Sequence, residues 1–237
     1  MEPAEYDLMD AAEDRMWWYR ALHTRLLAEL ADVHGDVLDA GCGTGGLLAR
    51  LRLARPDLRL IGLDWAEPAC RRAGVKSGVQ IVRGSGNALP FVDACFDAVI
   101  AADLLCHQAV DPGRALSELN RVLRPGGRLV VNMPAYAWLL SAHDRQVHNV
   151  RRQTAGQLAA MLREAGFRRV RTRYWNGLLL PLMVVQRKLL ARDAASSDVA
   201  AFQPWLNVTL HAMTEIERRL PFAVPAGGSV LATAERP

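Results

Sequence analysis

The stretch "VLDAGCGTGG", residues 37–46, places a carboxylate at the end of an apolar run that leads directly into glycines. A strand that continues into glycines and then a helix brings backbone N–H groups close to a ligand, because no Cβ keeps the ligand away. Gly41, Gly43 and Gly46 satisfy the dinucleotide pattern GxGxxG, and Asp64 follows about twenty residues later. The pattern predicts a nucleotide-containing ligand but does not choose between cofactors.

Asp39 narrows that choice. A carboxylate two residues before the first glycine would repel a diphosphate, whereas it would attract a cationic ligand. S-adenosylmethionine carries a sulfonium, an α-ammonium group and a ribose whose two hydroxyls suit a carboxylate such as Asp64. The two acids together therefore favour S-adenosylmethionine.

Alternating strands and helices must position these residues. Apolar and turn patterns predict strands at 36–41, 58–64, 79–84, 96–103, 127–134, 168–175 and 227–235, and helices at 44–55, 67–74, 112–123, 154–166, 181–192 and 205–220. Helical spacing at 5–31 predicts one or two further helices before the first strand. The early strands are almost continuously apolar, which indicates a mainly parallel sheet covered on both faces.

The chain is expected to form a single domain over residues 1–237. With 51% hydrophobic and 23% charged residues, it has enough apolar material for a sizeable core. We expect a helical cap at 1–34, a cofactor-binding core at 36–133, and substrate-side insertions at 134–152 and 176–226. Insertions of this size between sheet strands are typical of lids or binding walls.

Four segments carry a family resemblance. "VLDAGCGTG", "LIGLD", "GNALPFVDACFDAVIAADLLCH" and "LSELNRVLRPGGRLVV" resemble the class I S-adenosylmethionine-dependent methyltransferases, in particular the type 11 or UbiE-like small-molecule group. The resemblance covers residues 36–133 and continues more weakly through "AGFRRVRTRYW". It implies an α/β, Rossmann-like, seven-stranded, mainly parallel sheet with helices on both faces and an antiparallel last strand, together with S-adenosylmethionine as cofactor.

The resemblance also implies roles for individual residues. Asp39 and the first glycines would hold the methionine end of the cofactor, Asp64 the ribose hydroxyls, and Trp65 would pack on adenine. Where the family often has an acidic "GDA" turn, this chain has Gly-Ser-Gly-Asn at 84–87, so a neutral side chain would have to contact the adenine amino group. The expected cofactor-binding residues are Asp39, Gly41, Cys42, Gly43, Asp64, Trp65, Ser85, Gly86, Asn87, Asp103 and Leu104.

Methyl transfer from a sulfonium needs alignment and the exclusion of water, and a base only for acceptors such as alcohols or phenols. The candidate catalytic residues are His107, His143 and Asp144. The candidate substrate contacts are Trp18, Tyr19, Tyr136, His148 and Arg151. The alternatives are a polar loop in solvent for 141–152, a structural role for His107, and ordinary core packing for the aromatic residues.

Several classes of function are disfavoured. The net charge of +4 is spread along the chain without a basic stripe, so we expect no nucleic-acid partner. Four cysteines without CxxC spacing predict neither disulfides nor a metal site. The N-terminus lacks a signal-peptide pattern and the apolar segment 177–185 is too short to span a bilayer, so we expect a cytoplasmic protein without stable membrane insertion. We expect it to be a monomer or a homodimer.

The leading hypothesis is methyl transfer to a small-molecule acceptor with an O, N or C nucleophile. Two alternatives remain open from the residues alone. One is an NAD-dependent dehydrogenase, which Asp39 disfavours. The other is a non-catalytic regulatory or scaffold protein that binds the cofactor, which the altered turn at 84–87 keeps in consideration.

Overall fold

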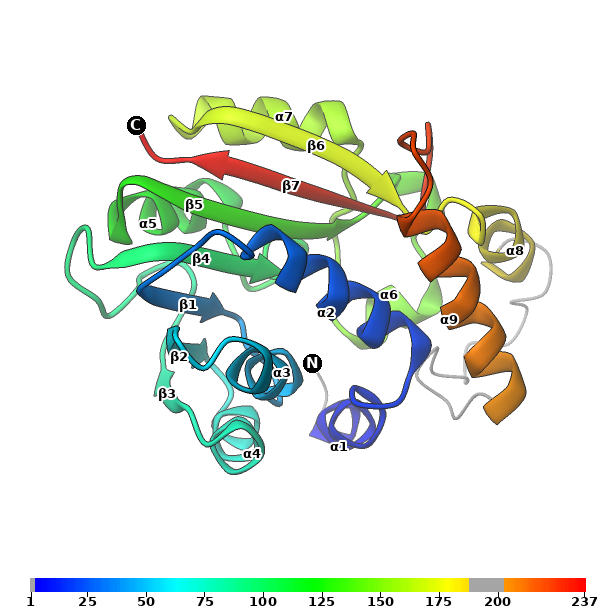
Figure 1. Ribbon diagram of the computed structural model, residues 1–237, viewed down its shortest axis with the longest axis horizontal. Coiled ribbons are helices and arrows are strands. Elements are labelled where there is room, and N and C mark those ends of the chain that lie inside the picture. The colour runs from blue at the N-terminus through cyan, green and yellow to red at the C-terminus, as the bar shows by residue number, and fades with distance from the viewer. Residues whose placement is uncertain (1–2, 188–202) are drawn as a thin grey trace.

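The computed structural model describes residues 3–187 and 203–237 and is built around one seven-stranded sheet (Figure 1). Its strands are β1 (Asp36–Ala40), β2 (Arg59–Asp64), β3 (Gln80–Arg83), β4 (Phe96–Ala102), β5 (Leu123–Pro134), β6 (Arg168–Trp175) and β7 (Ser229–Glu235). The strand order is β3-β2-β1-β4-β5-β7-β6. The pairs from β3 to β5 are parallel, and β7 runs antiparallel to both β5 and β6. The fold class expected from the sequence is confirmed.

Helices cover both faces of the sheet (Figure 1). They are α1 (Pro3–Ala12), α2 (Trp17–Glu29), α3 (Gly46–Ala54), α4 (Glu67–Ser77), α5 (Pro112–Val122), α6 (Ala142–Gln146), α7 (Ala155–Glu164), α8 (Leu180–Val185) and α9 (Pro204–Arg218), with a 3₁₀ turn η1 (Ala137–Leu139). Successive strand residues point to opposite faces. Leu38 therefore packs in the cluster with α5 and α7, whereas Val37 packs with α2 and α3.

The register brings the ends of neighbouring parallel strands together. Asp39 of β1 pairs with Gly62 of β2 and Ile100 of β4, so Asp39 and the last residues of β2 and β4 lie at the same edge of the sheet. Open α/β sheets bind ligands at this carboxyl edge. The alternation of elements read from the sequence thus places the predicted acids where a site can form.

The structure differs from the expected elements in three places. β5 begins at Leu123 rather than after the Pro-Gly-Gly turn, because Leu123 already pairs with Phe96 before the register shifts and Ala98 pairs with Arg128. The polar stretch after β5 contains η1 and α6, which the sequence pattern did not indicate. The helix expected at 181–192 corresponds to α8, and its residues from 188 onward lie outside the described part of the chain.

The long connection between β6 and β7 leaves the sheet and returns to it at one point. Trp175, the last residue of β6, is the antiparallel partner of Ser229, the first residue of β7. The described parts of this connection include α8 and α9, and α9 packs against α2. The ends of the connection are therefore fixed by the sheet itself.

Helix α1 is held against α4 by ion pairs. Lys76 of α4 lies 2.6 Å from a carboxylate oxygen of Asp10, 2.5 Å from Glu13 and 3.6 Å from Asp14, and Arg72 pairs with Asp7. Glu13 is almost fully buried; burial raises its pKa, and its contacts with Lys76 and Thr44 only partly offset that rise. Lys76 is thus the main cation that compensates the acidic face of α1.

Substitution of Gly62 by alanine should destabilise the fold, because an ideal Cβ there would lie 2.6 Å from both the Ile81 and Leu48 side chains. We expect a loss of about 1–3 kcal/mol in the free energy of unfolding, measured by urea denaturation. Gly74→Ala is the matched control: its Cβ would meet its nearest atom at 3.9 Å inside α4, so stability should rise by about 0.5–1 kcal/mol. Equal effects of the two substitutions would contradict this account.

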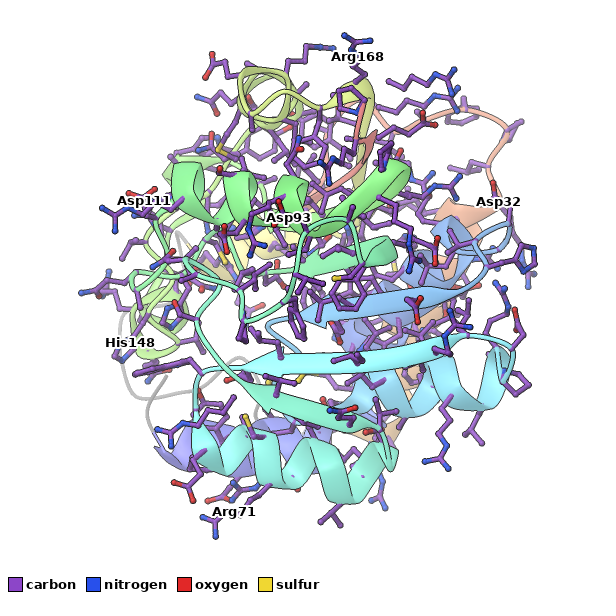
Figure 2. All side chains as sticks on the ribbon, turned by 90° about the vertical axis from the view of Figure 1, so that its left-hand side faces the viewer. Asp32, Arg71, Asp93, Asp111, His148 and Arg168 are labelled. Atoms are coloured by element: carbon purple, nitrogen blue, oxygen red, sulfur yellow. The ribbon has the colours of Figure 1, made fainter. Side chains whose placement is uncertain are left out.

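Replacement of Lys76 by methionine should release α1, because the buried Glu13 carboxylate would lose its cation. Hydrogen exchange of the amides of residues 5–12 should accelerate roughly tenfold or more, which corresponds to about 1.4 kcal/mol per tenfold. Arg71→Met is the control, because Arg71 projects from α4 into solvent (Figure 2) and, among the described residues, pairs only with the exposed Glu67 at 3.9 Å. If both variants exchange at the same rate as the unmodified protein, the ion pairs do not hold α1.

Candidate active site

A cavity of about 600 Å³ lies at the carboxyl edge of the sheet. Its walls come from the ends of β1, β2 and β4, from α1 and α2, and from the segments 144–152 and 176–187. Its size falls within the range typical of small-molecule and cofactor sites. All three acids expected at the strand ends, Asp39, Asp64 and Asp103, line it.

Asp39 is buried at the end of β1, and its carboxyl group has no compensating partner among the described residues. Its exposed fraction is 2%, and within the described residues no N–H or O–H group donates a hydrogen bond to its carboxylate. Burial, together with the charges of Asp64 and Glu13, raises its pKa to about 7. A carboxylate in this state offers a strong site for a cation.

Asp64 organises the glycine turn. Its carboxylate accepts hydrogen bonds from the backbone N–H groups of Gly43 at 3.0 Å and Ala66 at 2.9 Å, although burial still raises its pKa. Gly43 has a φ of +55° and Gly41 a φ of +86°, a region that favours glycine. The turn is thereby fixed between the two acids.

Helix α1 and the turn that follows it cover the glycine turn; the sequence predicted a helical cap at 1–34 but did not identify the residues that make these contacts. An ideal Cβ on Gly43 would lie 2.7 Å from Cε of Met9, and one on Gly46 would lie 2.6 Å from Cδ of Glu13. Thr44 donates a hydrogen bond to Glu13 at 2.7 Å. Tyr6 and Met9 of α1 and Glu13, in the turn directly after α1, line the cavity, and their spacing of three and four residues was the signal that could have identified them.

Tyr6 belongs to the same end of the cavity as Asp64 and Trp65. Burial and the charge of Asp64 raise the pKa of the Tyr6 hydroxyl to about 12, and a hydrogen bond with the Trp65 indole partly offsets that rise. Trp65 itself lines the cavity and is 59% exposed, so much of its side chain is accessible.

Asp103 follows β4 with a φ of +53°, which is uncommon for a residue with a side chain. Asn132 of β5 fixes it twice: the Asn132 carbonyl accepts from the Asp103 N–H at 2.9 Å, and the Asn132 amide nitrogen donates to the Asp103 carboxylate at 2.9 Å. The Trp175 indole N–H in turn donates to the Asn132 amide oxygen at 2.9 Å. Burial raises the pKa of Asp103 to about 7, so this carboxylate can change its protonation near neutral pH.

The remaining cofactor candidates divide into two groups. Those that line the cavity are Gly41, Cys42, Gly43, Trp65, Ser85 and Leu104. Gly86 and Asn87 are not part of the lining. Gly86 packs against Leu104, and the Asn87 amide group bonds the backbone of Ala109 and Asp111, so its polar atoms are engaged in the loop itself.

His107 lines the cavity, but it is a weak base. Burial lowers its pKa to about 4, and its Nδ1 accepts a hydrogen bond from the backbone N–H of Ala109 at 3.2 Å. Its ring stacks on that of His148 at a centroid distance of 6.0 Å, and His148 lies at the periphery of the molecule (Figure 2). The side chain of His143, the other candidate base, lies outside the described part of the structure.

Asp144 lies in a buried ion cluster. Its carboxylate accepts hydrogen bonds from Arg152 at 2.7 and 2.9 Å, from Arg187 at 3.2 Å, and from the backbone and hydroxyl of Ser141 at 2.8 and 2.9 Å. Burial raises its pKa, but the two guanidinium charges outweigh burial and the net pKa is lowered. The geometry gives Asp144 the role of an anchor between the segments 135–152 and 176–187. Arg187 of the cavity wall was missed because it lies 43 residues away in the chain.

The candidate substrate-contact residues also divide into those that line the cavity and those that do not. Trp18 and Tyr19 line the cavity, and Trp18 stacks on Trp175 at 6.0 Å. Tyr136, His148 and Arg151 are not among its lining residues. Tyr136 stacks on Tyr174 at 5.4 Å, and Arg151 donates to the carbonyls of His107 and Val110, so local packing and loop contacts engage both.

Comparison with known proteins gives the same picture of the core. A family model described as a methyltransferase domain, type 11, matches residues 38–131. The chain is 31% identical over 185 residues to a demethylmenaquinone methyltransferase of Lactiplantibacillus plantarum, a match that covers 62% of this chain and 78% of the relative. A demethylmenaquinone methyltransferase of Thermus thermophilus is 38% identical over 135 residues, which are 53% of this chain and 59% of the relative. A probable S-adenosylmethionine-dependent methyltransferase of Mycolicibacterium smegmatis is 33% identical over 162 residues, which are 66% of this chain and 61% of the relative. This chain thus spans about three fifths of the length of the Thermus and Mycolicibacterium relatives.

Solved structures share the fold over nearly the whole chain. A S-adenosylmethionine-dependent methyltransferase from Thermotoga maritima, titled a possible histamine N-methyltransferase, has a TM-score of 0.64 at 19% identity and covers 99% of this chain and 95% of its own. Phosphoethanolamine N-methyltransferase 2 of Haemonchus contortus, in complex with S-adenosyl-L-methionine, has a TM-score of 0.62 at 17% identity over 91% of this chain and 52% of its own. These structures share the fold, and the sequence matches show that the chain belongs to the type 11 family of S-adenosylmethionine-dependent methyltransferases.

Proposed function

We propose that this protein transfers a methyl group from S-adenosylmethionine to a small-molecule acceptor through an O, N or C nucleophile. The observation that carries the proposal is the buried Asp39 carboxylate, which has no donor among the described residues and lies beside a second buried acid, Asp64. This arrangement is unfavourable for the protein alone and becomes favourable when a cationic nucleoside supplies positive charge and hydroxyl donors.

The residues present fit that cofactor. Asp39, with Glu13 behind it, would hold the α-ammonium group, and Asp64 would accept hydrogen bonds from the ribose hydroxyls. Trp65 and Tyr6 would border the adenine, and Ser85 offers a neutral hydroxyl at the turn where the family often has an acid. When bound, the cofactor supplies a methyl group already activated by its sulfonium. The protein then has to align the acceptor and exclude water.

Of the cavity-lining groups Asp103, His107 and Asp144, Asp103 has the pKa best suited to a proton acceptor for an alcohol or phenol nucleophile. Its pKa of about 7 lies near neutral pH, whereas that of His107 is about 4 and Asp144 is engaged by two arginines. A base whose pKa lies near the working pH is the most effective in proton transfer. Asn132, which donates to one Asp103 oxygen, would act as a positioning residue.

Two of the relatives' names, demethylmenaquinone methyltransferase and 24-methylenesterol C-methyltransferase 2, support a small-molecule acceptor without choosing one. A third, malonyl-[acyl-carrier protein] O-methyltransferase, names an acceptor that is carried on a protein. A nicotinamide-dependent reaction is disfavoured, because Asp39 and Asp64 would both face a diphosphate with negative charge. A non-catalytic protein that binds the cofactor is distinguished by the turnover experiment below.

Cofactor affinity should increase with pH. Only the ionised Asp39 attracts the ammonium group, and with a pKa of about 7 roughly 3% is ionised at pH 5.5 against about 90% at pH 8. S-adenosylhomocysteine should therefore bind about thirtyfold more tightly at pH 8 than at pH 5.5, measured by isothermal titration calorimetry. Asp39→Asn should weaken binding at pH 8 and flatten the pH profile. Asp57→Asn, a surface substitution, should leave both unchanged, and a pH-independent affinity in the unmodified protein would contradict the proposal.

Turnover can be tested without knowing the acceptor. Incubation with methyl-labelled S-adenosylmethionine and fractionated extract of the host should label a low-molecular-weight product, identified by mass spectrometry. Asp39→Asn should reduce labelling at least tenfold at subsaturating cofactor, because binding of the cofactor is impaired. Binding of S-adenosylhomocysteine without any labelled product would support the non-catalytic alternative, and tight binding of NAD(H) instead would support the dehydrogenase.

A further inference from the structure

A chain of two buried hydrogen bonds ends at the carboxylate of Asp103. The indole N–H of Trp175, the last residue of β6, donates to Oδ1 of Asn132 at 2.9 Å, and Nδ2 of Asn132 donates to Oδ1 of Asp103 at 2.9 Å. Trp175 is 2% exposed, and Asn132 on β5 is fully buried. Because β7 lies between β5 and β6, the indole reaches across one strand of the sheet to meet the amide group.

The indole determines which way round the Asn132 amide group lies. An indole nitrogen can only donate a hydrogen bond, so the amide atom that faces it must be the oxygen. The NH₂ group must then face Asp103, where it stabilises the ionised carboxylate. An amide group turned the other way would place its oxygen against Asp103 and favour the protonated carboxyl group, which has a proton to donate.

The ring of Trp175 is itself held in place by neighbours on α2. Trp18 stacks on it at a centroid distance of 6.0 Å, and the guanidinium carbon of Arg25 lies 4.7 Å from its centroid. The carboxylate of Glu217 lies 3.8 Å from the same guanidinium group, and both side chains are almost fully buried. These contacts restrict rotation of the indole, so its N–H stays directed at Asn132.

Only one of the two Asp103 carboxylate oxygens is held by this chain. Oδ2 has no hydrogen-bond partner among the described residues and retains accessible surface, and Asp103 lines the cavity. The Asp103 N–H donates to the Asn132 carbonyl at 2.9 Å, so Asn132 fixes the backbone of Asp103 as well as its side chain. The protein thus binds one oxygen and leaves the other open to a ligand.

The other charged or titratable groups around Asp103 cannot replace this effect. Burial raises the pKa of Asp103, and the hydrogen bond from Asn132 lowers it more than the charge of Arg152 does. The charge of Asp144, which is paired with Arg152, acts in the opposite direction. The Cys106 thiol, which donates to the Asp103 carbonyl at 3.0 Å, has a pKa well above its usual value, and His107, with a pKa of about 4, is neutral at pH 7.

We propose that Trp175 is a positioning residue for methyl transfer to a hydroxyl group: through Asn132 it keeps Asp103 ionised and turned so that Oδ2 accepts the proton of the acceptor. This inference rests on the proposed function, in which Asp103 is the proton acceptor. The hydroxyl oxygen forms the new bond to the methyl carbon as the sulfur–methyl bond breaks, the bonding pair stays on sulfur, and the hydroxyl proton passes to Oδ2.

Titration of the Asp103 carboxyl carbon by ¹³C NMR tests this inference, with Asp103→Asn used to assign the resonance. Trp175→Phe keeps an aromatic ring beside Trp18 and Arg25 and removes the N–H. The pKa of Asp103 should rise by about one pH unit from about 7, which lowers the ionised fraction at pH 7 roughly fivefold. Leu231→Val is the matched control, because Leu231 packs in the same buried cluster as Trp175 without joining the chain of hydrogen bonds.

A double-mutant cycle separates an effect through Asn132 from a general loss of packing. Asn132→Leu removes the amide group and should also raise the pKa of Asp103. Adding Trp175→Phe to Asn132→Leu should then raise this pKa no further, because the indole acts only through the amide group. Additive rises in the two single variants would show that Trp175 acts by another route and would overturn the inference.

A measurement on the unmodified protein makes the test independent of how the variants fold. The indole N–H resonance of Trp175 should shift with pH at the same midpoint as the Asp103 carboxyl carbon, and this shift should vanish in Asp103→Asn. An indole resonance that does not follow Asp103, or an unchanged Asp103 pKa in folded Trp175→Phe, would overturn the inference. Failure to bind S-adenosylhomocysteine would instead overturn the proposed function, since none of these titrations needs a bound cofactor.

Discussion

The mutual repulsion of buried carboxylates at the edge of the sheet is the constraint on which the rest of the site depends. Asp39, Asp64 and Glu13 are close enough for Asp64 and Glu13 to raise the pKa of Asp39, and all three are nearly inaccessible to water. The parallel strands hold the first two acids in place whatever their charge, because backbone pairing fixes the register of β1 against β2. The fold thus holds these acidic groups close together, whereas in a flexible loop they would move apart.

The buried carboxylates at the two ends of the cavity differ in whether the protein itself supplies a positively charged partner. At the glycine turn, Asp39 lacks a compensating donor among the described residues, and Lys76 pairs with Glu13 and Asp10 instead. At the other end, Asp144 accepts from two arginines and a serine, so its charge is fully used inside the protein. The first arrangement suits the binding of a cation, and the second suits the joining of two wall segments.

The sequence was sufficient for the sheet and for the three strand-end acids, because periodicity identifies strands and parallel strands place their last residues at one edge. It was not sufficient for contacts between distant segments. Nothing in "EYDLMDAAED" shows that Met9 and Glu13 pack on the glycine turn, and nothing local to Asp144 indicates Arg187 as its partner. Asn176 was read only as the first residue of the insertion at 176–226, because the Glu217 carboxylate that accepts from its backbone N–H lies 41 residues further along.

The antiparallel pairing of Trp175 with Ser229 has a consequence for how this protein can diversify. The connection between these residues starts and ends at one pair of directly opposed residues. Its length and sequence can therefore change at little cost to the register of the strands in the sheet. The glycine turn and its acids lie on other strands and stay untouched by such changes. Natural variation or deliberate grafting can therefore exchange the connection between β6 and β7 as one unit, while the strands that carry Asp39 and Asp64 are inherited unchanged.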